Sequence, residues 1–232
     1  KMKFPFLFIA LDYQTQEEVF KAAEQLASSE GNFGFKVNSN ILLKNGLKEV
    51  VDQLKQFGKP IFADLKMFLG GRTMVWIAND IAELGVEFTN IHLLAGLDAV
   101  KEVNGVFKGT KTNLLGLTVP THYDEAYCQK YFGKPLVDKV VELIVVASEA
   151  GCKGIILPPP TLKLVGVTYD GLMVVPAIRV QGLPGFNDKR HAEDVTPRQA
   201  TGDGASILVC GTPVTKSQDM ASALKILLSE MD

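Results

Sequence analysis

The clearest chemical signal in the sequence is Asp64-Leu65-Lys66, which ends an apolar run that starts at Pro60. Residues i and i+2 of a strand point to the same face, so the carboxylate and the ammonium should project together. Charged groups in an apolar strand are unfavourable unless they are paired, and a buried ion pair that only holds the strand would meet that condition. Lys36 ends another apolar run, however. A Lys–Asp–Lys cluster exceeds what a structural pair needs, so we interpret it as an acid/base or electrostatic device.

A second group of polar residues follows the last two apolar runs. Arg179 and Gln181 occur in PAIRVQG, and Gly211 and Thr212 begin GTPVT. Glycine lets a backbone approach an anion closely, and the loops after the last two strands of a (β/α)8 barrel frequently bind phosphate. Ordinary turn chemistry would also account for these residues. If the chain forms such a barrel, we favour a phosphate site.

Eight apolar runs must position these residues, and helical or loop segments follow them. The runs are continuous rather than alternating, as expected for strands buried on both faces of a parallel sheet. This pattern predicts an α/β fold of the (β/α)8 TIM-barrel class, with residues 1–232 as one domain. A doubly wound open sheet usually has a glycine-rich turn after its first strand, whereas ALDYQTQEE has no glycine. The predicted strands are 6–12, 33–37, 60–66, 87–93, 112–119, 153–157, 172–178 and 206–211.

Helical patterns lie between these strands. Thr15 is a suitable N-cap for the first helix, because acidic residues follow it. We interpret Trp76 and its apolar neighbours Val75 and Ile77 as core. The predicted helices are 16–29, 41–57, 72–84, 136–150 and 216–231, with weaker patterns at 97–107 and 157–165.

The carboxyl ends of the strands are where a barrel builds its active site. Asp12, His92 and Thr121 stand at or just beyond such ends and join the candidate site. His92 could equally be a histidine satisfied within the core. The three histidines and three cysteines show no HxH, HExxH or CxxC spacing, so they do not predict a metal site.

Composition restricts the classes of function. The 24 Lys and Arg residues and 26 Asp and Glu residues give a net charge of −2, which argues against a nucleic-acid binder. No apolar run reaches the roughly 18 residues of a membrane span. The segment KMKFPFLFIALD resembles a signal peptide superficially, but Asp12 ends its apolar run and we interpret it as a strand. An odd number of cysteines without CxxC favours a reducing compartment, so we expect a cytoplasmic protein.

With these segments assembled, the chain resembles the orotidine 5′-phosphate decarboxylase family nearly from end to end. That family carries D-x-K-x-x-D on its third strand, L-T-S on its fifth, and PGIR-x-QG and VGR toward its C-terminus. The order and spacing of the matching segments are more specific than any one of them. The segments are FIALD, FKVN, FADLK, FTNIHLLAG, LLGLTVPT, VPAIRVQG, DKRHAEDVTPRQA and SILVCGTPVT.

The resemblance implies a reaction: orotidine 5′-phosphate loses CO2 without a cofactor and gives UMP, the last step of de novo pyrimidine synthesis. It implies that Lys66 stabilises and then protonates a carbanion-like C6, while Asp64 sits against the substrate carboxylate and Lys36 belongs to the same charge array. A homodimer is implied because the family builds its site at a subunit interface. The implied substrate-binding residues are Asp12 at the ribose, Thr73 toward the neighbouring site, and Thr121, Gln181, Arg179, Gly211 and Thr212.

Three positions depart from the family pattern. Leu69 replaces the last Asp of D-x-K-x-x-D, which should leave two lysines facing one carboxylate and depress a lysine pKa. His122 replaces the serine of L-T-S, and Thr212 replaces the phosphate arginine of VGR. A charge-assisted hydrogen bond contributes about 1.5–3 kcal/mol, so losing that arginine should weaken binding about 10- to 150-fold. The residues that could compensate are Arg179, Lys189 and Arg190.

Other functions stay open on the sequence alone. A protein that binds UMP-like nucleotides without turnover would explain the departures, although it gains nothing from the Asp64–Lys66 pair. A sugar-phosphate decarboxylase or aldolase of the same superfamily would use Mg²⁺ and generally a Glu on the second strand, where this chain has Lys36. A barrel acting on another phosphorylated metabolite is a further alternative. From the resemblance we expect a small nucleotide as partner, and no metal or other cofactor.

Overall fold

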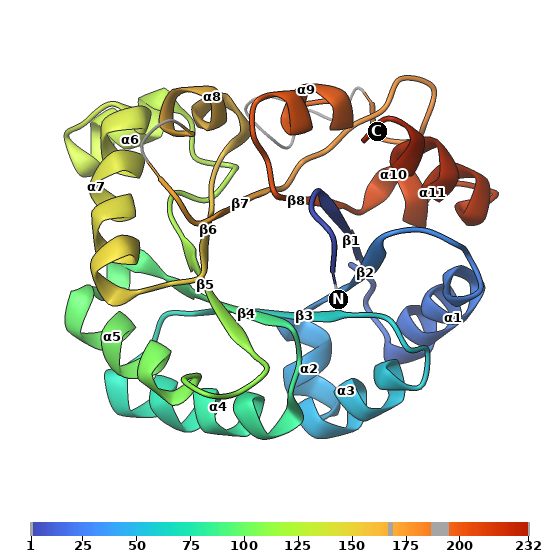
Figure 1. The fold of residues 1–232 in the computed structure, drawn as a ribbon, viewed down its shortest axis with the longest axis horizontal. Coiled ribbons are helices and arrows are strands. Elements are labelled where there is room, and N and C mark those ends of the chain that lie inside the picture. The colour runs from blue at the N-terminus through green and yellow to red at the C-terminus, as the bar shows by residue number, and fades with distance from the viewer. Residues whose placement is uncertain (1, 167–168, 187–194, 232) are drawn as a thin grey trace.

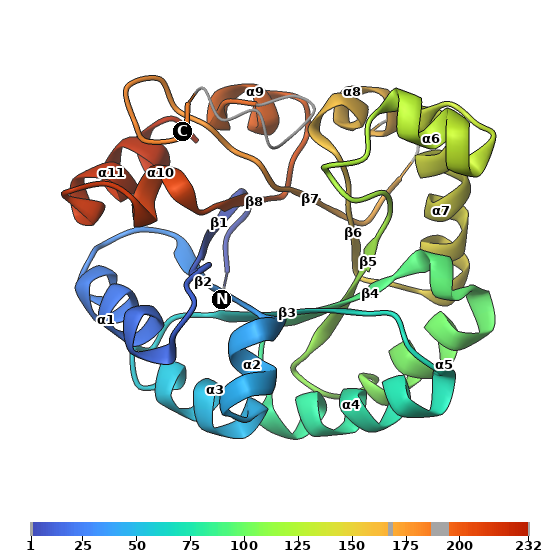
Figure 2. The same cartoon turned by 180° about the vertical axis from the view of Figure 1, so that it is seen from behind.

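The structure, a computed structural model, describes residues 2–166, 169–186 and 195–231. Within them, eight parallel strands close into a barrel in the order β1 to β8, and the helices form a ring outside it (Figures 1 and 2). The predicted (β/α)8 TIM-barrel class is confirmed. The strands are β1 Phe6–Ala10, β2 Phe33–Asn38, β3 Ile61–Met67, β4 Phe88–His92, β5 Asn113–Leu117, β6 Gly154–Ile156, β7 Leu172–Val175 and β8 Ile207–Cys210.

The helices connect successive strands and correct two predicted boundaries. The predicted helix 41–57 is divided at Gly46, whose φ of 90° lies outside the helical region. The predicted helix 216–231 begins only at Met220, because Asp219 is its N-cap and accepts a hydrogen bond from the Ser222 N–H. Thr15 is the N-cap of the first helix, as expected, and it also forms a capping box with Glu18. The helices are α1 Gln16–Ala27, α2 Ser39–Asn45, α3 Leu47–Lys55, α4 Gly71–Leu84, η1 Leu93–Ala95, α5 Leu97–Val106, α6 Glu125–Phe132, α7 Leu136–Ala150, η2 Pro159–Thr161, α8 Leu162–Val165, α9 Pro197–Gly202, α10 Thr212–Thr215 and α11 Met220–Ser229.

The core has two layers, one inside the barrel and one between the barrel and the helices. Inside the barrel, the rings of Phe8, Phe62 and Phe88 pack edge to face with centroids 5.7 to 6.4 Å apart. Their neighbours along each strand belong to the outer layer, so alternate positions of a strand face inward. Lys36 and Asp64 occupy inward positions of β2 and β3, and Asp64 follows Phe62 by two residues. The same pattern that fills the barrel with rings therefore brings charged groups into it.

The interpretation of Trp76 as core is wrong. The buried residues of α4 are Met74, Ala78, Ile81 and Leu84, and Trp76 is 61% exposed. The spacing of Met74, Ala78 and Ile81 defines the inward face of the helix, and position 76 lies on the other side of it.

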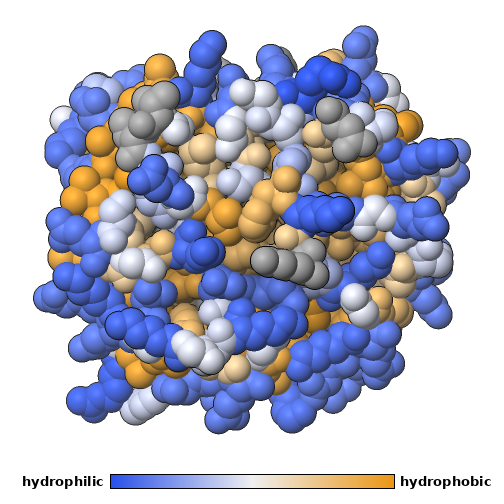
Figure 3. Space-filling view, in the orientation of Figure 1, coloured by the Kyte–Doolittle hydropathy of each residue, from blue (hydrophilic) through white to orange (hydrophobic). Residues whose placement is uncertain are grey.

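The face of the molecule seen in Figure 3 is rimmed by hydrophilic side chains, with hydrophobic atoms visible between them. Among the described residues, no helix is long and apolar enough to cross a membrane.

Candidate active site

A cavity of about 590 Å³ opens among the carboxyl ends of the strands, and residues of the loops that follow them line it. Its volume is within the usual range for small-molecule sites, about 300–1,000 Å³. Two predicted site residues are not brought to it: Thr73 on α4 and Gln181 in the turn after β7 are exposed and do not line this cavity. The predicted residues that do line it are Asp12, Lys36, Asp64, Lys66, His92, Thr121, Arg179, Gly211 and Thr212.

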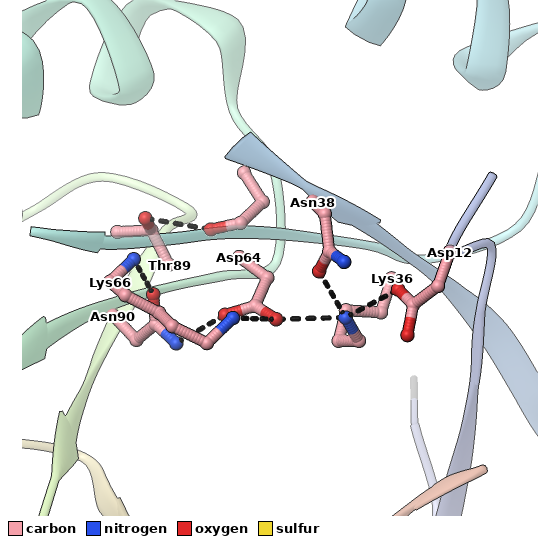
Figure 4. A network of polar contacts seen from close by, with 8 residues as sticks. Asp12, Lys36, Asn38, Asp64, Lys66, Thr89 and Asn90 are labelled. Atoms are coloured by element: carbon pink, nitrogen blue, oxygen red, sulfur yellow. Dashed lines mark hydrogen bonds and ion pairs between the residues drawn. The ribbon is translucent and has the colours of Figure 1, made fainter. Parts of the chain in front are cut away.

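Four charged side chains in the cavity form a chain of alternating sign (Figure 4). Lys36 Nζ lies 3.1 Å from Asp12 Oδ1 and 2.8 Å from Asp64 Oδ2, and Lys66 Nζ lies 2.6 Å from the same Oδ2. Both lysines face the Asp64 carboxylate, as expected, and Asp12 supplies a second carboxylate to Lys36. Two ammoniums and two carboxylates balance each other within one chain.

These contacts determine the ionisation of the two buried residues, Asp64 and Lys36. Burial disfavours the carboxylate form of Asp64, but the charges of Lys36 and Lys66 outweigh burial and hold the pKa of Asp64 well below its ordinary value. Burial likewise disfavours the charged form of Lys36, yet Asp64 and Asp12 raise its pKa above the ordinary value. The expected depression of a lysine pKa is therefore wrong for Lys36. Both groups of this pair are ionised near neutral pH.

Asp64 and Lys66 meet through a β-bulge rather than through the regular pleat. The ladder between β3 and β4 pairs Ala63 with Thr89 and resumes only at Met67 with Ile91. Within the bulge, Lys66 has a φ of 49° in the left-handed region, which costs a non-glycine residue about 1–2 kcal/mol. The Asp64 side chain is buried, whereas 47% of the Lys66 side chain is exposed to the cavity and solvent.

Two asparagines complete this network and were not identified from the sequence. Asn38 Oδ1 accepts a hydrogen bond from Lys36 Nζ. Asn90 Nδ2 donates to Asp64 Oδ1 over 2.7 Å, and its Oδ1 accepts from the Lys66 backbone N–H over 2.7 Å. A polar residue at the end of an apolar run was the available signal, since FKVN and FTNIH both contain one. Its partners depend on the bulge, which the sequence pattern does not disclose.

The opposite wall of the cavity carries further cations. Arg179 is buried after β7, and its Nη1 donates to the Ile178 carbonyl over 3.0 Å. Ala177, two residues before Arg179, has a φ of 63°. Lys216, which sequence reasoning missed, follows α10 and lines the cavity. Gly211 and Thr212 lie on the same wall, as expected, whereas Lys189 and Arg190 lie outside the described residues.

The loop after β5 brings aromatic side chains to the cavity. Thr121, His122 and Tyr123 line it, and the rings of His122 and Tyr123 have centroids 4.4 Å apart. Tyr123 stacks on Tyr127 of α6 with centroids 3.7 Å apart. The loop after β5 therefore adds aromatic rings to the wall of the cavity.

His92 lies at the edge of the charged network. It lines the cavity, and its ring centroid is 5.5 Å from that of the exposed Phe68. Burial and the charge of Lys66 lower the pKa of His92, and the charge of Asp64 opposes them. Of the two sequence interpretations, the structure favours the site over the core. No group of three His, Cys, Asp or Glu residues in the described part of the chain is arranged to hold a metal ion.

Leu69, which replaces the last acid of the family signature, is exposed between β3 and α4. Phe68 is exposed beside it, and Arg72 and Thr73 are exposed in the first turn of α4. Neither Leu69 nor Thr73 lines the cavity of the same chain.

Comparisons with known proteins show the family to which the chain belongs. The chain matches the Orotidine 5′-phosphate decarboxylase / HUMPS family over residues 5–227. It is 30% identical over 227 residues to the orotidine 5′-phosphate decarboxylase of Methylacidiphilum infernorum, covering 97% of this chain and 96% of that one. Against that of Nitrosococcus oceani it is 31% identical, with 97% of both chains covered.

A solved structure agrees with the barrel. The orotidine 5′-phosphate decarboxylase of Lactobacillus acidophilus superposes with a TM-score of 0.82 at 26% identity, over 99% of this chain and 100% of that one. The family match, the relatives and this structure all extend over almost the whole chain. The chain therefore belongs to the Orotidine 5′-phosphate decarboxylase / HUMPS family.

Proposed function

We propose that this protein is a lyase that decarboxylates orotidine 5′-phosphate to UMP without a cofactor. The observation that carries the proposal is the alternating chain Asp12–Lys36–Asp64–Lys66, which is assembled inside a cavity of suitable size. A binding protein needs no such arrangement of buried charge. An enzyme that must stabilise a developing carbanion does, because preorganised charges in a partly desolvated site act strongly on the transition state.

In this mechanism, Asp64 acts on the substrate carboxylate and Lys66 acts on C6, the two ends of the bond that breaks. The substrate carboxylate lies against the ionised Asp64, and their repulsion ends when the C6–carboxylate bond breaks and neutral CO2 leaves. The electron pair stays on C6, where the Lys66 ammonium stabilises it and then transfers a proton to it. Lys66 regains its proton from water after UMP forms. Lys36 holds Asp64 in place and in its charged form, and Asp12 binds the ribose.

The phosphate group occupies the wall formed after β7 and β8. Arg179 supplies a buried cation there, and Gly211 and Thr212 border the same space. We propose that Lys216 adds the second cation, which offsets the absence of an arginine at position 212. Binding of the phosphate supplies free energy that helps to stabilise the transition state at the distant pyrimidine ring.

We further propose that the working form is a homodimer in the cytoplasm. Phe68, Leu69 and Trp76 are exposed close together in sequence, around the start of α4. Exposed apolar side chains are common at interaction sites, and the resemblance implies that Thr73 points toward the neighbouring site, so we propose that a second copy of the chain covers this segment. The three cysteines are free and buried, which suits a reducing compartment.

The test is to mix the purified protein with orotidine 5′-phosphate in EDTA and to follow loss of the orotate absorbance and formation of UMP. Turnover in EDTA is the expected result. If there is no turnover but UMP raises the melting temperature, the protein binds nucleotides without catalysing this reaction. Turnover of a sugar phosphate that Mg²⁺ stimulates and EDTA abolishes would instead support the sugar-phosphate branch of the family. If neither UMP nor Mg²⁺ has an effect, another phosphorylated metabolite is the substrate.

A further inference from the structure

We propose that Asn90 is a positioning residue for the decarboxylation and fixes Asp64 and Lys66 relative to each other. This role rests on the proposed function of those two residues. Asn90 lies on β4, and its side chain reaches across to both of them on β3 (Figure 4). Only 1% of Asn90 is exposed, so its amide has exchanged water for these partners.

The first contact orients the Asp64 carboxylate. Lys36 and Lys66 both bind Oδ2, at 2.8 and 2.6 Å, whereas the Asn90 amide binds Oδ1 at 2.7 Å. The two oxygens therefore have different partners, and rotation of the carboxyl group would break contacts at both. Removing the Asn90 side chain would take away the hydrogen bond that it donates to Asp64 Oδ1.

The second contact supports the backbone of Lys66. The regular pairing of β3 with β4 is interrupted between Ala63 and Met67, and Lys66 lies within this interruption. A backbone N–H that leaves a ladder needs another acceptor, and the side-chain carbonyl of Asn90 provides it at 2.7 Å. This hydrogen bond holds Lys66 at its positive φ of 49°.

A single amide thus joins both reacting groups, and its two ends are not interchangeable. The oxygen must face the Lys66 N–H, and the nitrogen must face the Asp64 carboxylate. A carboxyl group at this position would keep the acceptor but set a second negative charge against Asp64. An alanine would remove both contacts.

The experiment compares Asn90→Ala with Thr89→Val as a matched control. Thr89 is the adjacent buried residue of β4, and its Oγ1 donates to the Ala63 carbonyl of β3 over 3.0 Å. The control removes a buried hydrogen bond between the same strands without touching a charged group. We expect Asn90→Ala to lower kcat about 100-fold, because small displacements of reacting groups have effects of that size. The KM and the Kd for UMP should stay within about threefold, and Thr89→Val should keep kcat within about threefold.

Asn90→Asp provides a second readout that a loss of packing would not change. As the pH falls, the introduced carboxyl group becomes protonated beside Asp64 and regains a donor, so activity relative to the wild type should rise. The charged and titratable groups near this position are Asp64 and Lys66 of β3, Lys36 of β2, His92 of β4 and Asp12 after β1.

Three outcomes would overturn the role of Asn90. They are an unchanged kcat in Asn90→Ala, an equal loss in Thr89→Val, and a constant ratio of Asn90→Asp to wild-type activity across pH. Absence of turnover by the wild-type protein is a different result, because it rejects the proposed function itself.

Discussion

The Lys66 ammonium lies 2.6 Å from the Asp64 carboxylate, although Lys66 extends from a backbone in the left-handed region. Asp64 keeps Lys36 as a second partner at 2.8 Å, so its carboxylate stays paired when Lys66 is removed. This arrangement separates the chemical role of Lys66 from the stability of the network.

Lys66→Ala should therefore abolish turnover while leaving binding intact. We expect kcat to fall by about 100- to 10,000-fold, as for loss of a general acid, and the Kd for UMP to change little. Steady-state kinetics with orotidine 5′-phosphate and calorimetry with UMP would measure the two effects. Lys101→Ala on α5, an exposed lysine outside the cavity, serves as control. Wild-type activity in Lys66→Ala would reject the mechanism.

The sequence predicted the barrel because its strands are buried on both faces and therefore form continuous apolar runs. It also identified Asp12, Lys36, Asp64 and Lys66, since charged residues inside such runs are rare without a role. The break at Gly46 was missed because apolar spacing alone does not register a single residue with a positive φ.

The parts of the site that could not be predicted depend on tertiary geometry. Asn90 acts through a bulge in the neighbouring strand, and the pairing of Asp12 with Lys36 needs the register of β1 against β2. Lys216 reaches the cavity only because α10 ends before it. The exposure of Trp76, in contrast, could have been predicted from the sequence, because the helical spacing of Met74, Ala78 and Ile81 places position 76 on the outer face of α4.

Ala177 should be a strained residue whose replacement by glycine is better tolerated than usual. Its φ of 63° costs about 1–2 kcal/mol, and glycine adopts that value freely. Ala205 is a matched control, because it is also 6% exposed but has no positive φ. Both Ala→Gly changes lose one buried methyl and gain unfolded-state entropy, so the difference between them isolates the strain. We expect Ala177→Gly to retain about 1–2 kcal/mol more unfolding free energy than Ala205→Gly, by urea titration. Equal losses would mean that position 177 is not strained.

Lys216 should act on the phosphate group and not on the ring. Lys216→Met is expected to raise the KM for orotidine 5′-phosphate and the Kd for UMP about tenfold, the effect of about 1.4 kcal/mol. Binding of uridine, which lacks the phosphate, should not change. Lys163→Met on α8, an exposed lysine outside the cavity, is the control for loss of a surface charge. An equal effect on uridine and UMP would assign Lys216 a role away from the phosphate.

His92 should titrate below the ordinary histidine pKa of about 6.5. Burial and the Lys66 charge lower the pKa of His92. The folded state therefore binds this proton less readily than the unfolded chain, and stability is lost as the pH falls below about 6.5. NMR titration of the imidazole, assigned with His92→Gln, should show the low pKa, and Lys66→Ala should raise it. Lys101→Ala should not move it. An unchanged His92 pKa in Lys66→Ala would mean that the Lys66 charge does not reach the ring.

Trp76 tests whether the exposed start of α4 is an interface. If two copies of the chain cover Phe68, Leu69 and Trp76 in a homodimer, Trp76→Glu should dissociate it, because a charge would be buried without a partner. Sedimentation velocity at micromolar concentration would show the change from dimer to monomer. Tyr131→Glu on α6 introduces the same charge at another exposed aromatic residue and should leave the dimer intact.

Turnover should fall with dissociation, because Thr73 does not line the cavity of its own chain and would have to act in its partner's. A monomeric wild-type protein with full activity, or a Trp76→Glu dimer, would show that the start of α4 is not where subunits meet.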